Sequence, residues 1–587
     1  MKSVCLCLAA SLAGLGQVAY AQAYPAPAYP AQAYPDVKRT SLYVPVRDGT
    51  RLAVNIYRPS RSGAVEAQPL PTIFVFTPYR ARYRDEKGAT VETALSDSLA
   101  LRSLLQAGYV VAVADIRGKG ASFGHRHGFQ DRTEARDGYD LVEWLASQPF
   151  SNGKVGMIGC SYLGGTTFHT ATTAPPSLKA VFIGASDLDK YAFVRNGGIT
   201  AQFNTRPDEA PEVDLASEPV DADPDGTQLK QAVAEHGANT PMAQLWYSMP
   251  FRDSVSPLTG NDFWNEVAVY RYLDAIKDAG IATYFWGNWQ DEPTSQVILG
   301  AANLGGKFLA GPGGHCASPQ GFDFAGEMVR YFDHYLKGIP NGIEAEPRAT
   351  YWVEGLGGQG EYVRSAQLPG VQSRPLAWYF AGGRSGTARS VNDGRLAIGA
   401  GAPGMDSFAV DYDLPPADYF AFWAGPMDHK GLSYTSEPLK KPLPLVGFPV
   451  ARLAVATDNP QADLWVYLDL VQPDRPVEVI SFGRIKLAQR KLAQAPYDTL
   501  GQPWHSGLSK DAEPPQPGAR VPVSLALTAM SRVIPAGARL RVTIAGADPR
   551  QRNIKDIALD PAPTIKVFFG GEDGSRIELP LAEELEK

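Results

Sequence analysis

The sequence lacks any concentration of one sign of charge, and this shortage narrows the classes of partner that it can have. Lysine and arginine total 55 and aspartate and glutamate total 62, so the formal net charge is only -7, and neither sign forms a long run. A basic surface for nucleic acid or for an anionic membrane is therefore not expected. A small-molecule substrate is the expected partner, and the sequence leaves open whether the chain forms a homo-oligomer.

Long apolar runs are also missing, except for one at the N-terminus. Residues 4–15 form an apolar run after Lys2, and a small-x-small pattern ends at Ala21. The run is shorter than the about 20 residues that a spanning helix needs, so it predicts a signal peptide over residues 1–21, cleaved after Ala21. A lipid-modified cysteine is not expected, because Cys5 and Cys7 come too early. The sequence therefore predicts an exported protein, periplasmic or secreted, without a membrane anchor.

The rest of the chain divides into segments of different composition. A length of 587 residues exceeds what one hydrophobic core usually serves, so more than one domain is expected. Residues 22–36 repeat Ala, Tyr and Pro and predict an extended linker. Residues 37–347 predict an α/β domain, interrupted at about 187–278 by an inserted helical cap. Residues 348–587 predict a C-terminal β-sandwich of the jelly-roll type.

Alternating strands and helices are the reason for the α/β prediction. An Asp48-Gly49 turn joins two strands in a hairpin at residues 41–57. Short apolar runs predict buried strands at residues 72–76, 109–114, 154–158, 178–183, 281–286 and 307–310. Helical periodicity at 94–106 and 134–147 falls between strands, which indicates a parallel sheet with helices on both faces. Alternating runs such as 451–456, 464–470, 539–544 and 564–569 predict the strands of the sandwich.

One of the buried strands ends in a serine flanked by glycines. Gly159 and Gly164 surround Ser161, and a helix-compatible stretch follows. This pattern is typical of a nucleophile elbow, in which a tight turn lifts the serine hydroxyl above the edge of the sheet. The usual pattern has glycine two residues after the serine, where this chain has Leu163, so an ordinary glycine-rich turn is the alternative.

An acid and a histidine follow in the order that an α/β-hydrolase requires. Asp291 comes after the penultimate strand of the α/β domain, and His315 comes after the last. His315 is expected to take the proton of Ser161 as the hydroxyl attacks, and Asp291 to orient the imidazole. The adjacent Glu292 is the rival acid. The fold class is therefore predicted as an α/β-hydrolase domain with an inserted helical cap, followed by the β-sandwich.

The remaining histidines offer no better site. His125 and His127 resemble a metal pair, but no third ligand stands at a recognisable spacing. His169 and His334 fall inside predicted helices and are expected to be structural. Neither a metal nor another cofactor is expected.

The tetrahedral oxyanion of an acyl-transfer reaction needs hydrogen-bond donors. The backbone N–H of Tyr162, directly after the nucleophile, is one candidate. The loop after residues 72–76 supplies the other, where Pro78 has no N–H and Tyr79 can donate through its hydroxyl or its amide. A tyrosine that only packs at the end of a strand is the alternative.

The motifs together resemble those of the family of cocaine esterase, the X-Pro dipeptidyl-peptidases and the α-amino-acid ester hydrolases. The matching segments are Pro78-Tyr79, Asp115 to Gly118 with Ser122 and Gly124, Gly159 to Gly164, Trp289 to Asp291, and Gly311 to His315. The resemblance implies the Tyr79 hydroxyl as an oxyanion donor, a helical cap over the pocket and a jelly roll beside it. The amino-ester subclass binds an ammonium group with clustered carboxylates, and Pro293 and the stretch 191–197 do not provide them.

The positions of the cysteines lead to a disulfide hypothesis. Cleavage after Ala21 leaves only Cys160, directly before the nucleophile, and Cys316, directly after the base. A Ser–His contact would bring the two segments close enough for bridging, as in the similar arrangement of tannases and fungal feruloyl esterases. We expect a Cys160–Cys316 disulfide that stabilises the fold by roughly 4 kcal/mol; two buried free thiols are the alternative.

These patterns predict an exported serine hydrolase that cleaves a carboxylic ester, or as a second choice an amide, through an acyl-enzyme on Ser161. A peptidase or acylase of the same family is one alternative. A non-catalytic protein that binds glycans or a surface is another. Aromatic residues of the cap either line an apolar pocket or hold the cap together: Trp246, Tyr247, Phe251, Phe263, Trp264 and Tyr270.

Overall fold

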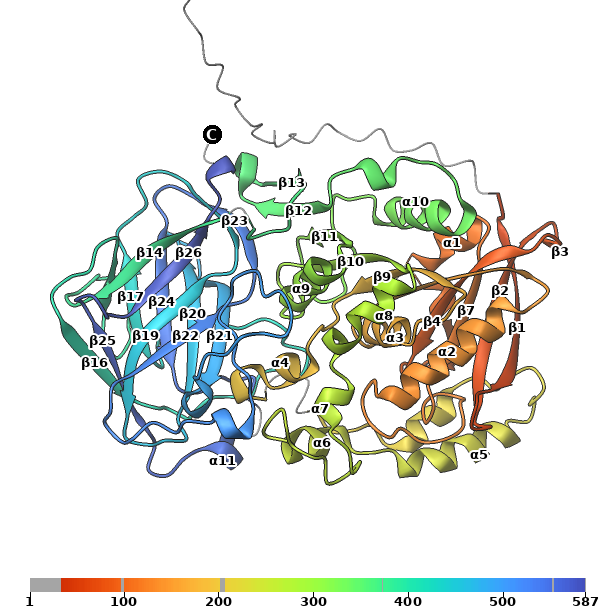
Figure 1. Cartoon of the computed structure of the whole chain (residues 1–587), viewed down its shortest axis with the longest axis horizontal. Helices are drawn as coiled ribbons and strands as arrows, with labels where there is room; N and C mark the ends of the chain where they lie inside the picture. Colours follow the sequence, from red (N-terminus) through yellow and green to blue (C-terminus); the bar gives the residue numbers. More distant parts are fainter. Residues whose placement is uncertain (1–32, 97–99, 201–205, 372, 552–553, 586–587) are drawn as a thin grey trace, which may run out of the picture.

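The computed structural model has an α/β part and a β-rich part that lie side by side (Figure 1). It describes residues 33–96, 100–200, 206–371, 373–551 and 554–585. The predicted signal peptide and most of the predicted linker lie outside the described residues. No helix within the described ranges is long and apolar enough to cross a membrane.

The α/β part is built on one twisted sheet. Its strands pair in the order β1-β2-β7-β4-β8-β9-β10-β11-β12-β13, and the run from β7 to β12 is parallel. The bounds are β1 Asp36–Pro45, β2 Arg51–Arg61, β4 Leu70–Thr77, β7 Val110–Asp115, β8 Ser151–Cys160, β9 Leu178–Gly184, β10 Ala282–Asn288, β11 Lys307–Gly311, β12 Ala349–Glu354 and β13 Gly360–Ser365. The predicted hairpin opens the sheet as β1 and β2. The short β3 (Ala64–Val65), β5 (Arg82–Arg84) and β6 (Thr90–Glu92) are outside this order.

Apolar residues predominate in the central strands because helices cover both faces of the sheet. Every residue of β7 is buried, for example. The helices are α1 Leu101–Gln106, α2 Arg132–Ala146, α3 Tyr162–Ala171, α9 Thr294–Leu304 and α10 Phe324–Lys337. Helix α2 begins two residues before its predicted start because the Asp131 carboxylate accepts hydrogen bonds from the backbone N–H groups of Thr133 and Glu134. Helix α1 is shorter than the predicted helix at 94–106.

The segment between β9 and β10 is helical, as the sequence predicts for the cap. It contains α4 Lys190–Val194, α5 Thr227–Glu235, α6 Met242–Ser248, α7 Phe263–Glu266 and α8 Leu273–Asp278, and helices α5, α6 and α7 lie along the lower side of Figure 1. Trp246 and Trp264 stack with ring centroids 5.4 Å apart, and Phe263 packs beside them in one buried cluster. These three aromatic side chains therefore hold the cap together.

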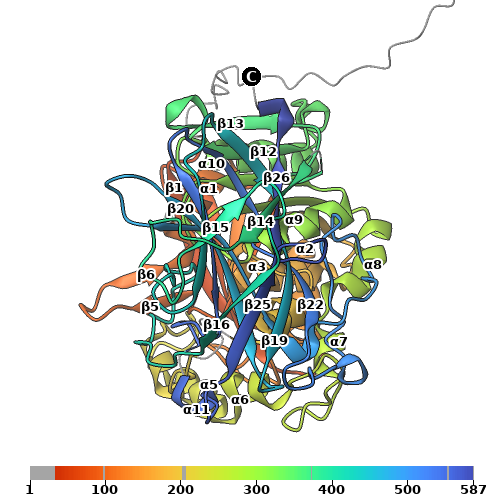
Figure 2. The ribbon, with the colours of Figure 1, turned by 90° about the vertical axis from the view of Figure 1, so that its left-hand side faces the viewer.

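The β-rich part follows, and Figure 2 shows its strands facing the viewer. Strands β15, β17, β24, β20 and β21 pair in that order, and β14, β26, β19 and β22 pair in another group. The bounds are β14 Arg374–Ala381, β15 Gly394–Ala397, β16 Gly404–Ala409, β17 Leu432–Ser436, β18 Leu443–Gly447, β19 Val450–Thr457, β20 Asp463–Val471, β21 Glu478–Lys486, β22 Val521–Ala526, β23 Met530–Ile534, β24 Arg539–Ala545, β25 Thr564–Phe569 and β26 Arg576–Leu581, with a short helix α11 at Ile554–Ile557.

Both groups of strands contribute to one apolar core. Val466 and Val542 enter it from the first group, and Val455 and Ile577 enter it from the second. The chain is therefore β-rich around a shared core here, and the jelly-roll connectivity stays a prediction. Strands β12 and β13 lie beyond residue 347, where the sequence places the domain boundary, yet they extend the α/β sheet.

A buried ion pair joins the two parts. The Glu292 carboxylate lies between Arg484 of β21, with Nη1 to Oε1 at 2.8 Å, and Arg550, with Nη1 to Oε2 at 3.6 Å. Arg550 also pairs with Asp548 at 3.0 Å. All four side chains are buried, so each charge depends on its partner.

Glu292→Gln is expected to lower the free energy of unfolding by about 3 kcal/mol, because it leaves the buried Arg484 without its counter-charge. Arg484→Met in the same chain should restore much of the loss. Denaturant unfolding of both variants and the double variant measures this coupling. Arg374→Met, which breaks an exposed ion pair with Glu583, is the control and should cost less than about 1 kcal/mol. Additive effects of the two buried changes would contradict the expectation.

Candidate active site

Ser161 occupies a sharp turn between β8 and α3. Its backbone has φ 60° and ψ -128°, a left-handed conformation that is costly for a residue with a side chain. The two flanking glycines are required by space. A Cβ on Gly159 would lie 2.1 Å from the Leu163 carbonyl oxygen, and a Cβ on Gly164 would lie 2.1 Å from the Gly184 carbonyl oxygen. The structure therefore has the elbow that the sequence predicts. It accommodates the side chain of Leu163, at the position where the usual pattern has glycine.

His315 and Asp291 meet at the ends of neighbouring strands. The His315 Nδ1 lies 3.0 Å from both carboxylate oxygens of Asp291. Asp291 follows β10 and is buried, and His315 follows β11 and keeps 18% of its side chain exposed. Burial raises the pKa of Asp291, whereas the imidazole beside it acts in the opposite direction. The carboxylate therefore accepts from one edge of the imidazole and leaves the Nε2 edge for another group.

The rival acid Glu292 faces a different partner. Its carboxylate is held by Arg484 and Arg550 at the junction with the β-rich part. Of the two adjacent acids, Asp291 alone has a hydrogen bond with the imidazole among the described residues. The sequence could not separate them, because the choice depends on arginines about 190 and 260 residues away along the chain.

The loop that carries His315 is fastened by a residue that the sequence analysis missed. Asn288, the last residue of β10, donates from its amide nitrogen to the carbonyl oxygens of Gly314 at 2.8 Å and Ala317 at 2.7 Å. The backbone N–H of Gln290 also donates to the Gly313 carbonyl at 3.0 Å. These bonds hold the residues on both sides of His315. A buried amide at the end of a strand, beside the candidate acid, is a signal that could have indicated it.

The predicted disulfide is present between Cys160 and Cys316. Their Cα atoms lie 5.9 Å apart across a sequence separation of 156 residues. The bond ties the residue before Ser161 to the residue after His315. The His315 Nε2 is buried and has no hydrogen-bond partner among the residues that the structure describes. This nitrogen is therefore available in the region that the disulfide joins to Ser161.

Tyr79 and Tyr162 both adjoin the serine. The Tyr79 oxygen has hydrogen-bond contacts with the Ser161 side chain and with the backbone N–H of Tyr162. Although the whole residue is 50% exposed, its hydroxyl end lies among protein atoms, and this desolvation raises the pKa of Tyr79. The structure thus brings both predicted oxyanion donors to the same side of Ser161.

The Tyr162 phenol is anchored below the turn. Its hydroxyl donates to the Glu134 carboxylate at 2.7 Å, and Arg126 lies 3.4 Å from the same hydroxyl. Burial raises the pKa of Glu134 to about 8, against the lowering effect of the Arg126 charge. The Tyr162 side chain is thereby fixed at the first residue of α3.

Asp115 holds the loop that carries Tyr79. It is the last residue of β7, and its carboxylate accepts from the backbone N–H of Ala81 at 2.6 Å and of Ala121 at 3.0 Å. A Cβ on Gly120 would lie 2.3 Å from this carboxylate, which explains the glycine. Burial raises the pKa of Asp115 to about 7. Asp115 belongs to a segment that the resemblance singled out, but its role follows only from these contacts.

The other histidines lie apart from this arrangement. His125 and His127 are adjacent and exposed, with ring centroids 4.7 Å apart, and the described residues form no cluster of three metal-ligand side chains. His169 is buried, and desolvation brings its pKa well below the usual value. His236 Nδ1 contacts Asp214 at 3.0 Å, but its Nε2 faces the Ser122 carbonyl at 2.8 Å, so neither nitrogen adjoins a nucleophile.

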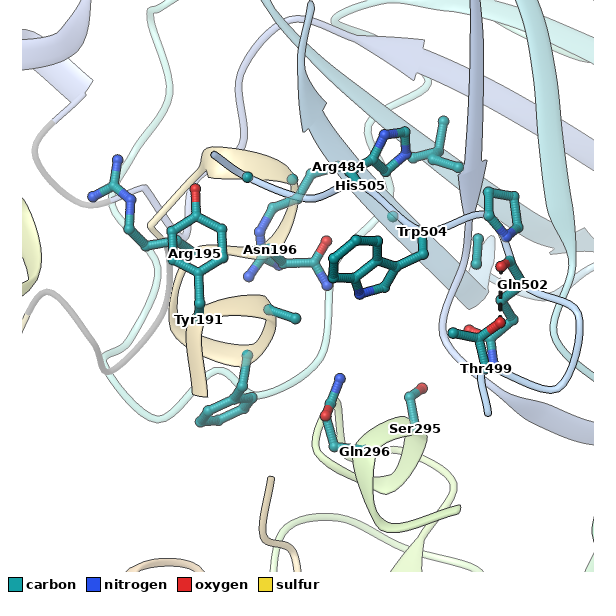
Figure 3. Close-up of a pocket in the computed structure, with 18 of the residues that line it drawn as sticks. Tyr191, Arg195, Asn196, Ser295, Gln296, Arg484, Thr499, Gln502, Trp504 and His505 are labelled. Atoms are coloured by element: carbon teal, nitrogen blue, oxygen red, sulfur yellow. Dashed lines mark hydrogen bonds between the residues drawn. The ribbon is translucent and has the colours of Figure 1, made fainter. Parts of the chain in front are cut away.

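A cavity of about 130 Å³ lies at the junction of the cap, α9 and the β-rich part. Figure 3 shows Trp504 near its centre, with Arg484 on one side and Gln296 on the other. Ser161, Asp291 and His315 are not among its lining residues. The cavity is thus separate from the candidate active site, although Glu292 lines it.

The chain is similar to known proteins over most of its length. Residues 48–317 match the family model of the X-Pro dipeptidyl-peptidases (S15 family), and residues 341–556 match the model of their C-terminal non-catalytic domain. A Mycobacterium bovis protein classed by name among the serine esterases is 28% identical over 625 residues, covering 93% of this chain and 96% of that protein. Cocaine esterase of a Rhodococcus species is 24% identical over 511 residues, covering 77% of this chain and 83% of that enzyme.

Solved structures share the fold. An α-amino acid ester hydrolase has a TM-score of 0.69 at 19% identity, with 94% of this chain and 98% of that chain covered. A CocE/NonD family hydrolase from Staphylococcus aureus has a TM-score of 0.67 at 18% identity, with 93% and 94% covered. The predicted fold class, an α/β core with a β-rich part after it, is confirmed.

Loss of the disulfide is expected to destabilise the fold strongly. Replacing both cysteines, Cys160→Ala with Cys316→Ala, should lower the free energy of unfolding by about 4 kcal/mol, because the bond closes a loop of 156 residues. Thermal unfolding with and without reductant measures the effect. The double variant is the control, since reductant should not shift its melting temperature. An unshifted native protein with both thiols shown free by mass spectrometry would contradict the expectation.

Asp291→Asn is expected to slow the reaction of Ser161 with a fluorophosphonate by about 10,000-fold, because the imidazole loses the carboxylate that fixes its tautomer. Glu292→Gln is the matched control at the adjacent position. Its rate, normalised to folded protein, should stay within about tenfold of the native rate, since its partner is Arg484. The reverse order of the two rates would assign the acid to Glu292.

Proposed function

Because the chain belongs to the family of cocaine esterase, the X-Pro dipeptidyl-peptidases and the α-amino-acid ester hydrolases, we propose that it is an exported serine hydrolase of carboxylic esters. The family places it among the serine hydrolases. Ser161, His315 and Asp291 are proposed as its catalytic triad, with Tyr79 and the Tyr162 N–H as oxyanion donors.

One observation carries this proposal more than any other. A buried carboxylate accepts from Nδ1 of an imidazole whose loop is covalently joined to the residue before a strained serine. A serine hydroxyl is a weak nucleophile unless a base removes its proton during attack. The Nε2 of His315, which has no hydrogen-bond partner in the described part of the chain, is the atom to do this.

The mechanism follows from these positions. His315 takes the Ser161 proton as the oxygen attacks the ester carbonyl, and the imidazolium is stabilised by Asp291. The developing oxyanion is stabilised by the Tyr79 hydroxyl and the Tyr162 N–H, a role supported by the contacts of the Tyr79 oxygen with the Ser161 side chain and with that N–H. His315 then gives its proton to the leaving alcohol, and a water activated by the same imidazole releases the acid from Ser161.

Esters are favoured over X-Pro amides by sequence identity, which is 28% for a Mycobacterium bovis protein with an esterase name and 23% for a Streptomyces avermitilis protein with an Xaa-Pro dipeptidyl-peptidase name. The Mycobacterium bovis protein aligns over 93% of this chain and bears an esterase name. A peptidase or acylase remains the second candidate because the family model is named after X-Pro dipeptidyl-peptidases. Export is supported by the sequence of residues 1–21 and by the disulfide, since such bonds persist in oxidising compartments.

A fluorophosphonate probe should label the folded protein at Ser161, because only an activated serine reacts at a useful rate. Ser161→Ala should abolish labelling. Ser151→Ala, at the other end of β8, is the matched control and should label like the native protein. Peptide mapping by mass spectrometry identifies the labelled residue.

A panel of nitrophenyl esters and X-Pro nitroanilides then separates the two enzyme candidates. Faster turnover of the esters supports the esterase, and faster turnover of the X-Pro amides supports the peptidase. Folded protein that is neither labelled nor active on the panel would leave a non-catalytic binding role as the better account.

A further inference from the structure

A loop of the β-rich part reaches the candidate active site. It runs from residue 410 to residue 431, between β16 and β17. Its Phe422 ring stacks on the His315 imidazole with ring centroids 3.9 Å apart and an interplanar angle of 15°. The matched family model describes this part of the chain as non-catalytic. The contact therefore places a side chain of the second part directly against the proposed base.

The loop is fastened close to Phe422, so the stacked ring does not depend on His315 for its position. The Trp423 Nε1 donates to the Val479 carbonyl oxygen of β21 at 2.8 Å, and its ring packs on Phe482 with centroids 5.1 Å apart. Ala424 and Met427 are buried in the same apolar cluster. Farther along, Asp428 pairs with the buried Arg541 at 2.8 Å. The ring of Phe422 is thus presented by an anchored segment.

The Phe422 ring restricts a motion of the His315 imidazole that the contact with Asp291 still allows. The hydrogen bonds to Asp291 fix Nδ1, but the imidazole can still tilt about that contact. A parallel ring at 3.9 Å blocks this tilt on one face and keeps Nε2 in a fixed plane. The electron-rich face of a phenyl ring also attracts a cation, so the contact becomes stronger when the imidazole takes a proton. The stack is therefore worth more in the transition state than in the resting enzyme.

We propose that Phe422 is a positioning residue for His315, through which the β-rich part takes a share in the hydrolysis. The inference rests on the proposed function, because it requires His315 to be the base. Phe422 acts only through the imidazole: it orients the ring and stabilises its protonated form. The same property distinguishes it from a residue that merely fills space, since an aliphatic side chain of similar size would pack but would not stabilise a cation.

The test compares Phe422→Leu, Phe422→Tyr and Phe420→Leu in the full chain. Phe422→Leu removes the aromatic face and keeps apolar bulk, and Phe422→Tyr restores the face. Phe420→Leu is the matched control, two residues away in the same loop and 59% exposed. The readouts are the rate of fluorophosphonate labelling at Ser161, kcat and KM on a small nitrophenyl ester, and the melting temperature.

Phe422→Leu should lower the labelling rate and kcat by about tenfold, in keeping with a lost ring contact to a forming cation. KM should change by less than about twofold, because the ring acts on the transition state more than on substrate binding. Phe422→Tyr and Phe420→Leu should stay within about twofold of the native protein in all three values. Should Phe422→Leu melt early, Phe422→Met provides a second aliphatic variant for the same comparison.

Equal labelling rates of the native protein and a folded aliphatic variant would overturn the inference. The inference would also be overturned if Phe422→Tyr lost as much of the labelling rate as Phe422→Leu. A role in packing alone predicts no preference for an aromatic side chain at this position. A native protein that the fluorophosphonate does not label at all would instead overturn the proposed function. The labelling rate of the native protein therefore separates this outcome from a failure of the Phe422 inference alone.

Discussion

The site depends on a loop that must cross the edge of the sheet. Ser161 follows β8 and His315 follows β11, with β9 and β10 between them. Three strand intervals of about 4.8 Å would leave the two strand ends about 14 Å apart. The segment after β11 must therefore run back over its neighbours, and the Cys160–Cys316 bond, with Cα atoms 5.9 Å apart, holds it there. Asn288 secures the same segment on the way, because it binds the carbonyls on both sides of His315.

Much of the fold and of the candidate site could be predicted from the sequence, because it depends mainly on residues that are close together in the chain. Gly159 and Gly164 lie where a Cβ atom would clash with backbone atoms. The tight turn at Ser161 could therefore be predicted from residues next to it in the chain. Buried strands appear in the sequence as short apolar runs. The pairing of the cysteines follows once Ser161 and His315 are placed in one site. The helix predicted at 94–106 was too long. The helical periodicity of the apolar residues begins at residue 94, whereas α1 begins only at Leu101.

What the sequence did not predict depends on contacts between distant segments. Asp291 and Glu292 are neighbours with the same chemistry, and only Arg484 and Arg550, far along the chain, decide which of them is engaged elsewhere. The role of Asp115 depends on the backbone N–H groups of Ala81 and Ala121, which belong to two separate loops and donate to its carboxylate. The triad itself combines an observed Asp–His contact with a serine whose approach to the imidazole is argued from the disulfide, so the sequence prediction of the triad stays a prediction.

The disulfide has a topological consequence for the cap. It closes a covalent ring from Cys160 to Cys316, and this ring contains β9, every helix of the cap, β10 and β11. Exchange of a structural element between two copies of a chain requires that the element swing out on an open hinge and dock on its neighbour. A cap whose two ends belong to one closed ring can tilt or breathe, but any exchange must keep both of its connections on the parent chain. In the oxidised protein the cap is thus part of a closed covalent loop that begins and ends beside Ser161 and His315.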